Sequence, residues 1–403
     1  MSINAVPSIF GVMAKPAGSG CNLKCDYCYY LEKQKLYNST SPLMEDETIE
    51  LFIKQYIQSQ ESNEIQFVWQ GGEPALLGVE YFNRIVELQK KYAGKARVFN
   101  AFQTNGTLID LEWARFLKKN NFLVGISIDG PQHIHDYYRK YRNGNSSFDD
   151  VMQGIELLKS HRVEFNTLSV VNRYSEKFPL EVYSFMKKVG SSFMQFLPAV
   201  ERLNAQSNPA ELQLTHQKTK DAEITDWSVT PKGYGNFLKE IFDHWVRKDV
   251  GKTFVQMFDV TLANWMGKNP GLCVHKDYCG DALVIERNGD VYACDHFVYP
   301  EYSRRNIHEK SLREMFFSKE QISFGLDKKK SLSINCRACD FRFACHGDCP
   351  KHRFVDSGKD SLKISYLCPG LKEFFHHVKP AMDFMSNELK NHRPPSNIMN
   401  NKV

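Results

Sequence analysis

Three cysteines near the N-terminus have the spacing of ligands for an iron–sulfur cluster. The stretch is Cys21-Asn-Leu-Lys-Cys25-Asp-Tyr-Cys28, and it follows a short apolar run at residues 10–14. Three thiolates on one loop can bind three irons of a [4Fe–4S] cluster and leave the fourth iron without a protein ligand. An open coordination position is where a small molecule binds and reacts, whereas structural sites are closed by four ligands. A zinc site completed by a distant ligand, or buried free thiols, are the alternatives that spacing leaves open.

Eight further cysteines lie in the C-terminal half of the chain: Cys273, Cys279, Cys294, Cys336, Cys339, Cys345, Cys349 and Cys368. Asn288-Gly289 stands between two apolar runs and predicts a β-hairpin bracketed by the second and third of these cysteines. The next four follow the pattern C-x2-C-x5-C-x3-C, and thiolates at such spacing can surround compact metal sites. Two zinc ribbons that only stabilise a small domain are the alternative interpretation.

The elements that must position these residues follow an alternating pattern. Between residues 8 and 200, short apolar runs predict strands at 9–15, 65–70, 97–104, 123–128, 164–171 and 193–198. Amphipathic segments predict helices between them at 45–58, 80–92, 110–119, 148–160 and 179–189. This rhythm is typical of parallel βα units, which suit an open doubly wound sheet or a partial barrel. The unusual polar residues follow the carboxyl ends of the strands, the face where barrel enzymes place their sites.

Composition narrows the class of protein. A chain of 403 residues predicts one large domain and a smaller one. The net charge of +5 is mild and its Lys and Arg residues are scattered, so neither nucleic acid nor an acidic membrane is an expected partner. No apolar stretch reaches membrane-spanning length, and no signal peptide is recognisable. Eleven cysteines, several in tight clusters, then indicate metal ligands in a reducing cytoplasm rather than secreted disulfides.

The first cysteine stretch, with an aromatic before its last cysteine, resembles the cluster motif of radical S-adenosylmethionine (SAM) enzymes. In that family the amino and carboxylate groups of SAM bind the open iron. One electron cleaves SAM to methionine and a 5′-deoxyadenosyl radical, which abstracts an unactivated hydrogen. The resemblance implies six contacts to SAM, from its amino group through its carboxylate and ribose to its adenine: Gly72, Glu73, Ser127, Arg139, Tyr27 and Val200. Without the family, Arg139 would be interpreted as a solvated charge on a helix.

The C-terminal cysteine pattern resembles the SPASM extension of radical SAM peptide-modifying enzymes. The resemblance implies two auxiliary [4Fe–4S] clusters, one bound by Cys273, Cys279, Cys294 and Cys349 and the other by Cys336, Cys339, Cys345 and Cys368. With the N-terminal motif this makes three clusters. The expected fold is therefore α/β, a partial (β/α)6 TIM-like radical SAM barrel followed by a small cysteine-rich domain. The expected divisions are 8–232 for the core, a partial barrel that ends in a polar linker at about 202–232, 233–272 for connecting helices, 273–370 for the SPASM domain, and 371–403 for a helix and tail. Residues 1–7 and the polar tail after about residue 388 are expected to be disordered.

Nearly the whole chain is similar to the anaerobic sulfatase-maturating enzymes. The similarity includes Lys15-Pro16-Ala17, Trp69-Gln70-Gly-Gly-Glu-Pro, Gln103-Thr-Asn-Gly and Cys294-Asp295. It implies oxidation of a sulfatase Cys or Ser to Cα-formylglycine without oxygen. In that reaction Asp295 would take the thiol or hydroxyl proton, and a neighbouring cluster would accept the second electron. Tyr30 and Gln70 would orient the target side chain.

The expected partners are a sulfatase polypeptide with a Cys/Ser-x-Pro-x-Arg motif and an electron donor such as flavodoxin or ferredoxin, with the chain a monomer. Two other functions would share the cysteine pattern: a SPASM maturase that forms thioether or carbon–carbon crosslinks in a peptide, and a non-catalytic metal-binding module. The product separates these three functions. An aldehyde indicates formylglycine formation, a crosslinked peptide indicates a SPASM maturase, and the absence of deoxyadenosine indicates a metal-binding module. The sequence does not decide between Cys and Ser targets, and it does not identify the client sulfatases or the physiological donor.

Overall fold

The computed structural model describes residues 9–37, 41–204 and 222–400, and these form two compact units. Unit 1 combines Met1–Ser127, Arg139–Phe165 and Cys279–Leu326. Unit 2 combines Ile128–Tyr138, Asn166–Tyr278 and Asp327–Val403. Each unit therefore draws together segments that are far apart along the chain. In the described residues, no helix is both long and apolar enough to cross a membrane.

Unit 1 contains a mixed sheet whose strand order is β12-β11-β10-β1-β2-β3-β4. Four strands run parallel in chain order: β1 (Gly11–Lys15), β2 (Glu64–Trp69), β3 (Arg97–Thr104) and β4 (Phe122–Ser127). On the other side of β1 lie β10 (Ala282–Glu286), which is parallel to it, and then the antiparallel β11 (Asp290–Tyr292) and β12 (Ser303–Asn306). The β1–β10 pairing aligns Lys15 with Glu286, so these two residues occupy equivalent positions on neighbouring strands.

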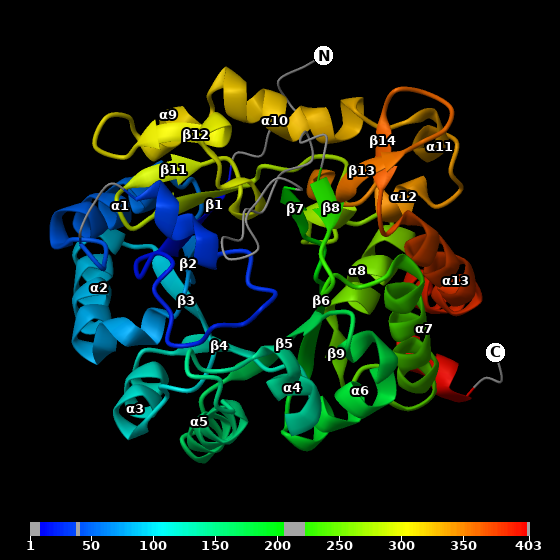
Figure 1. Ribbon diagram of the computed structural model, residues 1–403, viewed down its shortest axis with the longest axis horizontal. Coiled ribbons are helices and arrows are strands. Elements are labelled where there is room, and N and C mark those ends of the chain that lie inside the picture. Colours follow the sequence, from blue (N-terminus) through cyan, green and yellow to red (C-terminus); the bar gives the residue numbers. More distant parts are fainter. Residues whose placement is uncertain (1–8, 38–40, 205–221, 401–403) are drawn as a thin grey trace. The chain divides into compact units, whose positions relative to one another are not determined.

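Aromatic packing holds the strands of unit 1 against its helices. The helices are α1 (Asp46–Ser59), α2 (Gly78–Ala93), α3 (Leu111–Lys119), α5 (Phe148–Ser160) and α9 (Leu312–Phe316), and Figure 1 shows α1, α2 and α3 along one side of the strands. Phe67 and Trp69 on β2 stack at 5.6 Å, and Phe82 of α2 meets Trp69 edge-on at 5.9 Å. These rings are fully buried, so they contribute much of the apolar stabilisation of the unit.

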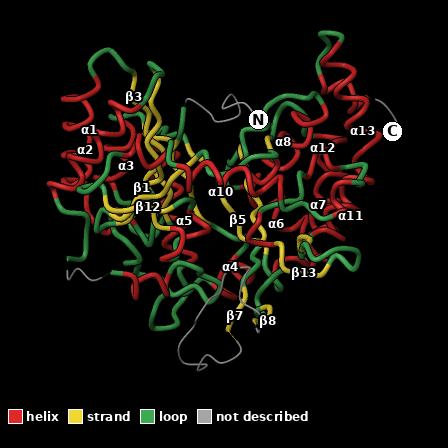
Figure 2. Tube along the Cα trace, turned by 90° about the horizontal axis from the view of Figure 1, so that it is seen from above, coloured by secondary structure: helices red, strands yellow, loops and turns green. Residues whose placement is uncertain are grey.

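Helices make up much of unit 2, and Figure 2 draws the helices of the chain as red tubes. Its parallel strands are β5 (Phe165–Val171), β6 (Phe193–Pro198) and β9 (Phe254–Val255). Its antiparallel pairs are β7 (Arg202–Asn204) with β8 (Ala222–Ile224) and β13 (Arg353–Asp356) with β14 (Lys363–Ser365). Its helices are α4 (Gln132–Tyr138), α6 (Pro179–Lys188), α7 (Pro231–Lys248), α8 (Gln256–Trp265), α11 (Ile334–Arg337), α12 (Arg342–Cys345) and α13 (Cys368–Lys390). Helix α10 (Lys319–Lys330) continues from unit 1 into unit 2.

Helices α7 and α13 approach each other closely because glycines meet where they pack. A Cβ on Gly235 would lie 2.6 Å from the carbonyl oxygen of Gly370, and a Cβ on Gly370 would lie 1.7 Å from the carbonyl oxygen of Pro231. No side chain fits in that space. The contact at Gly370 lies close to Cys368, where α13 begins.

The predicted elements agree with the structure to within a residue or two. All six strands and all five helices predicted before residue 200 are present, and the hairpin after Cys279 forms as β10 and β11. The elements that were not predicted include helix α4, strand β9, strands β7, β8 and β12 to β14, and helices α9 to α12. Much of the polar stretch 202–232, at 205–221, lies outside the described residues, and its ends pair as β7 and β8.

Two other expectations concern the ends of the chain. Residues 1–7, expected to be disordered, lie outside the described part of the chain. The tail after about residue 388 differs from the disorder that its polar composition predicts. It forms a 3-10 turn at Pro395–Asn400, in which Ile398 is buried and Asn397 donates to Glu388. Arg393 also forms an ion pair with Glu388, and these contacts account for the order.

The hairpin of β10 and β11 belongs to unit 1 because β10 pairs with β1. The sequence-based division at residue 273 follows the chain, whereas the compact units combine distant segments. The four-part division of the chain stays a prediction.

Candidate active site

The cysteine loop that follows β1 is held by backbone contacts within unit 1. The amide of Lys24 donates to the carbonyl of Lys140 at 2.8 Å, and the amide of Cys28 donates to the carbonyl of Cys25 at 3.0 Å. The sulfur of Cys21 accepts from the amide of Leu23 at 3.4 Å. Burial raises the pKa of Cys21 to about 11, with Glu73 and Cys28 contributing in the same direction. The thiols of Cys21 and Cys28 are therefore within electrostatic reach of each other, as ligands of one cluster must be.

The turn after β2 brings Gly72 and Glu73 against this loop. The amide of Gly72 donates to the carbonyl of Gly18, and the amide of Glu73 donates to the carbonyl of Gly20, both at 2.7 Å. A Cβ on Gly72 would lie only 2.0 Å from the Gly20 oxygen, so the position requires glycine.

Glu73 is fully buried, and its carboxylate has one acceptor position to spare. It accepts hydrogen bonds from Ala75 N (2.9 Å), Thr104 Oγ1 (2.7 Å) and Asn105 N (2.6 Å). Burial raises its pKa, while these three bonds and the charge of Arg139 act in the opposite direction. A carboxylate has about four lone-pair sites, and three are used here. The remaining site could accept from an ammonium group such as that of SAM.

Arg139 is buried rather than solvated, which overturns the interpretation made without the family. Its exposed fraction is 6%, and its Nη1 donates to the hydroxyl of Tyr27 at 2.9 Å. Its charge acts on both Cys21 and Glu73, so it lies in their neighbourhood. A buried cation beside the thiols and a carboxylate is suited to binding a carboxylate ligand.

The other expected SAM and substrate residues are placed as follows. Ser127 ends β4 and accepts from Gln103 Nε2 at 2.9 Å. Gln70 follows β2, and its backbone N–H donates to the carbonyl oxygen of Ala14 at 2.9 Å. Val200 follows β6 in unit 2 and is buried. Their contacts with ligands stay predictions.

The expected base, Asp295, is held by two residues of unit 1 that sequence reasoning did not single out. Lys15, at the end of β1, pairs with Asp295 Oδ1, and the Tyr29 hydroxyl donates to Oδ2 at 2.6 Å. The Lys15 side chain is 1% exposed and that of Asp295 is 17% exposed. Burial alone would raise the pKa of Asp295, but Lys15, His296 and the hydrogen bonds from Lys15 and Tyr29 lower it to about 2. The carboxylate is therefore ionised and able to accept a proton.

Tyr30 contacts a second carboxylate, Glu286, which sequence reasoning also missed. Its hydroxyl donates to Glu286 Oε2, and so does the hydroxyl of Tyr37, at 2.6 Å. The Lys15 ammonium lies over the Tyr30 ring, 3.7 Å from its centre. Glu286 is 1% exposed, and burial raises its pKa. The hydroxyl expected to orient a substrate is thus engaged within the protein, and its substrate role stays a prediction.

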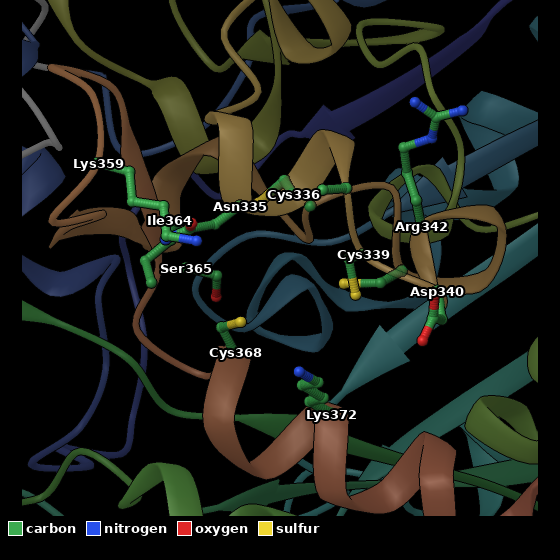
Figure 3. A pocket seen from close by; sticks show the side chains of 13 residues that line it. Asn335, Cys336, Cys339, Asp340, Arg342, Lys359, Ile364, Ser365, Cys368 and Lys372 are labelled. Carbon is green, nitrogen blue, oxygen red and sulfur yellow. The ribbon is translucent and has the colours of Figure 1, made fainter.

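Four of the C-terminal cysteines surround one cavity of about 400 Å³ in unit 2: Cys336, Cys339, Cys345 and Cys368. Figure 3 shows the side chains of Cys336, Cys339 and Cys368 around it, the last at the start of α13. Burial raises the pKa of Cys345 to about 12 and that of Cys368 to about 11, and neighbouring thiols add to both shifts. All four are free thiols. A donor set of four thiols around a cavity fits an iron–sulfur cluster. Across the described residues, no group of three or more His, Cys, Asp or Glu side chains converges on a single metal ion. A [4Fe–4S] cluster makes a different demand, because each of its four thiolates binds a separate iron.

The remaining four cysteines are divided between the units. Cys279 and Cys294 lie in unit 1, at either side of the β10–β11 hairpin, whereas Cys273 and Cys349 lie in unit 2. None of these four cysteines is joined in a disulfide. The shared cluster that the family resemblance implies for them stays a prediction.

Comparison with known families identifies two domains. Residues 16–185 match the radical SAM superfamily, and residues 273–340 match the SPASM family, an iron–sulfur cluster-binding domain. The expected fold class, a radical SAM domain and a SPASM domain on a mixed α/β sheet, is confirmed. SAM and iron–sulfur clusters are the cofactors that these domains imply, and three clusters are consistent with the family of the relatives below.

Relatives of known name cover almost the whole chain. The serine-type anaerobic sulfatase-maturating enzyme of Bacteroides thetaiotaomicron is 49% identical over 96% of this chain and 94% of its own length. The cysteine-type enzyme of Clostridium perfringens is 34% identical over 94% of this chain and 99% of its own. The structure of native anSMEcpe with bound AdoMet and the Cp18Cys peptide has a TM-score of 0.82 at 33% identity, covering 94% of this chain and 99% of that one. Streptococcus suis SuiB, at 14% identity and a TM-score of 0.57, shows a shared fold alone.

The radical SAM and SPASM matches, the thiol sites and nearly full-length identity of 49% all agree. The chain belongs to the anaerobic sulfatase-maturating enzymes, radical SAM proteins with a SPASM domain.

Proposed function

We propose that this chain oxidises a Cys or Ser side chain of a sulfatase to Cα-formylglycine under anaerobic conditions. The observation that carries the proposal is the 49% identity to a serine-type sulfatase-maturating enzyme over 96% of this chain. When bound, SAM and its cluster supply the radical that removes a hydrogen from the target Cβ. Cys21, Cys25 and Cys28 would bind that cluster, and Glu73 and Arg139 would bind the charged groups of SAM.

Asp295 is the group that we assign to proton removal. The target thiol or hydroxyl must lose a proton as its Cβ is oxidised, and a carboxylate kept ionised by Lys15 and Tyr29 can accept it. The auxiliary clusters, which the eight C-terminal cysteines would hold, would accept the second electron. A cysteine target gives a thioaldehyde that water converts to the aldehyde, whereas a serine target gives the aldehyde directly.

Asp295→Asn tests this assignment. We expect the variant to keep the iron content of the wild type and to cleave SAM, but to form formylglycine at least 100-fold more slowly, because general-base catalysis contributes about 10²–10⁴-fold. Mass spectrometry of a target peptide measures the product, and release of 5′-deoxyadenosine measures SAM cleavage. A wild-type rate of aldehyde formation would remove Asp295 from the mechanism.

The type of target residue is a finer question, and we propose that serine is accepted. The serine-type relative at 49% identity supports this, although a serine-type enzyme of Klebsiella aerogenes, at 32%, is more distant than the cysteine-type enzymes at 34%. Matched peptides with Ser or Cys in a Ser/Cys-x-Pro-x-Arg motif, incubated in parallel, test it. Turnover of the Cys peptide alone would contradict it.

The proposed partners are the sulfatase polypeptide and a small electron donor such as flavodoxin or ferredoxin. We also propose that the chain works as a monomer in the cytoplasm. With all eleven cysteines as ligands of three clusters, anaerobic reconstitution should give about twelve irons per chain. A measured value of four would mean that the C-terminal cysteines bind no clusters.

A further inference from the structure

A buried arginine, Arg353, makes every hydrogen bond that a guanidinium can make. It begins β13 and is 5% exposed. Its acceptors are the carbonyl oxygens of four residues and one hydroxyl: Gly347 (2.7 Å), Lys328 (2.6 Å), His346 (2.9 Å), Asp348 (3.0 Å) and Ser331 Oγ (3.3 Å). A guanidinium has five N–H donors, so none is left over. All five acceptors are neutral, and the positive charge is therefore not compensated by its own hydrogen bonds.

Three of these acceptors belong to the short loop that joins Cys345 to Cys349. The loop has an unusual backbone, because His346, Gly347 and Asp348 all have positive φ angles, of 49°, 76° and 60°. Residues with side chains rarely adopt this conformation, which costs roughly 1–2 kcal/mol each. Arg353 binds the carbonyl of every one of the three. A Cβ on Gly347 would lie 2.7 Å from Arg353 Nη2, so the loop and the guanidinium fit closely.

Most of the groups that can act on Arg353 as anions are cysteines, which become thiolates when they bind a cluster. Burial lowers its pKa, whereas Asp348 and the thiols of Cys336, Cys349 and Cys345 raise it. The Asp348 carboxylate is itself hydrogen-bonded by His352 Nδ1 at 2.8 Å and Ser365 Oγ at 2.7 Å. Cys336 and Cys345 line the four-thiol cavity.

A buried charge is costly unless an opposite charge accompanies it. A [4Fe–4S] cluster with four thiolates is an anion in both oxidation states and gains one more negative charge on reduction. A fixed cation nearby stabilises the reduced state more than the oxidised one, which raises the reduction potential. An arginine cannot lose its proton in a protein, so this charge is present at any working pH.

We propose that Arg353 is a positioning residue for the auxiliary cluster of the four-thiol cavity. It anchors the loop that presents Cys345, and its buried charge would raise the reduction potential of that cluster, which is one of the two auxiliary clusters proposed to carry the electron away from the substrate. The proposal rests on the proposed function and on the assignment of the four thiols as ligands. The step is a one-electron reduction of the cluster, and it requires no proton because the countercharge is already in place.

The test measures a potential rather than activity alone. A full-length background with Cys21→Ala, Cys25→Ala and Cys28→Ala removes the N-terminal cluster, so that redox titration followed by electron paramagnetic resonance reports the auxiliary clusters. Arg353→Gln removes the charge, and Arg353→Lys keeps it. The matched control is Arg342→Gln, because Arg342 lines the same cavity but is exposed to solvent.

We expect Arg353→Gln to make reduction of one auxiliary cluster at least tenfold less favourable, a shift of about 59 mV for a one-electron couple. The reduction equilibrium constants of Arg353→Lys and Arg342→Gln should stay within about threefold of the background. Arg353→Lys keeps the positive charge, and solvent already screens the charge that Arg342→Gln removes. An unchanged potential in Arg353→Gln, with its iron retained, overturns the proposal.

If Arg353→Gln loses its iron, Arg353→Lys provides the test instead. Retained iron in Arg353→Lys, with a reduction equilibrium constant within threefold of the background, supports the role of the charge. Lost iron in Arg353→Lys, or a tenfold change in that constant, overturns it. Failure of the underlying assignment is distinguishable, because the background itself would then bind far fewer than about eight irons per chain.

Discussion

Replacing Lys15 tests whether the geometry around Asp295 keeps that carboxylate ready to accept a proton. Lys15 is 1% exposed and pairs directly with Asp295, whose pKa is lowered to about 2 despite burial. A contacting pair of opposite charges in a protein contributes about 4 kcal/mol at an effective dielectric constant of 20. Since one pKa unit corresponds to about 1.4 kcal/mol, Lys15→Met should raise the pKa of Asp295 by about three units.

The direction of the pH effect follows from that shift. With a pKa of about 2, the wild-type carboxylate is ionised throughout the practical range, so its protonation does not limit the rate. With the pKa raised by about three units, formylglycine formation by Lys15→Met should fall to half its plateau at a pH about three units higher than in the wild type. Any charge on the neighbouring cluster acts on both proteins alike, so the comparison isolates the lysine. The measurement is aldehyde formation in a target peptide between pH 5 and 8, alongside SAM cleavage.

Two control variants separate this effect from damage to the fold. Lys15→Arg keeps the cation and should keep the wild-type profile. Lys15→Met leaves an uncompensated buried carboxylate, which costs about 3–5 kcal/mol of stability, and a double variant with Asp295→Asn should recover stability without recovering activity. Superimposable pH profiles for Lys15→Met and the wild type, at equal iron content, would refute the reasoning.

Three further variants address other parts of the molecule. Glu73→Gln should keep its iron but slow release of 5′-deoxyadenosine by about 10–100-fold, because one charge-assisted hydrogen bond to SAM is worth about 1.5–3 kcal/mol. Gly370→Ala places a methyl group 1.7 Å from the first carbonyl of α7, so it should lower the melting temperature and, by displacing Cys368, remove about four irons per chain. Burial opposes ionisation of Asp249, but Lys187 lowers its pKa below 3.8, so this pair stabilises the fold fully above that pH and loses its effect as pH falls through the lowered value. Lys187→Met should therefore move the acid-unfolding midpoint upward, as measured by circular dichroism, and an unmoved midpoint would contradict the pairing.

The local pattern of the sequence was sufficient to predict the strands and helices before residue 200 and to indicate that the cysteines bind metal clusters. Strands and helices before residue 200 have periods of two and 3.6 residues, which depend only on neighbouring residues, and the structure contains them. Asn288-Gly289 predicts its hairpin for the same reason. Spacing also places Cys21, Cys25 and Cys28 on one loop, since eight residues cannot separate them far.

Contacts between distant segments could be found only in the folded chain. Lys15 and Asp295 are 280 residues apart and meet because β10 pairs with β1. The local sequence of either strand does not predict this parallel pairing. The same pairing places Glu286 beside Lys15 and puts the hairpin in unit 1.

The sequence alone determined that this chain carries three groups of thiols on an α/β frame. The tertiary structure decided which charges surround them: Lys15 for Asp295, and Arg353 for the loop between Cys345 and Cys349. The physical reason is that periodicity and spacing are local properties of a chain. The free energy of a buried charge, in contrast, depends on every group that folding brings near it.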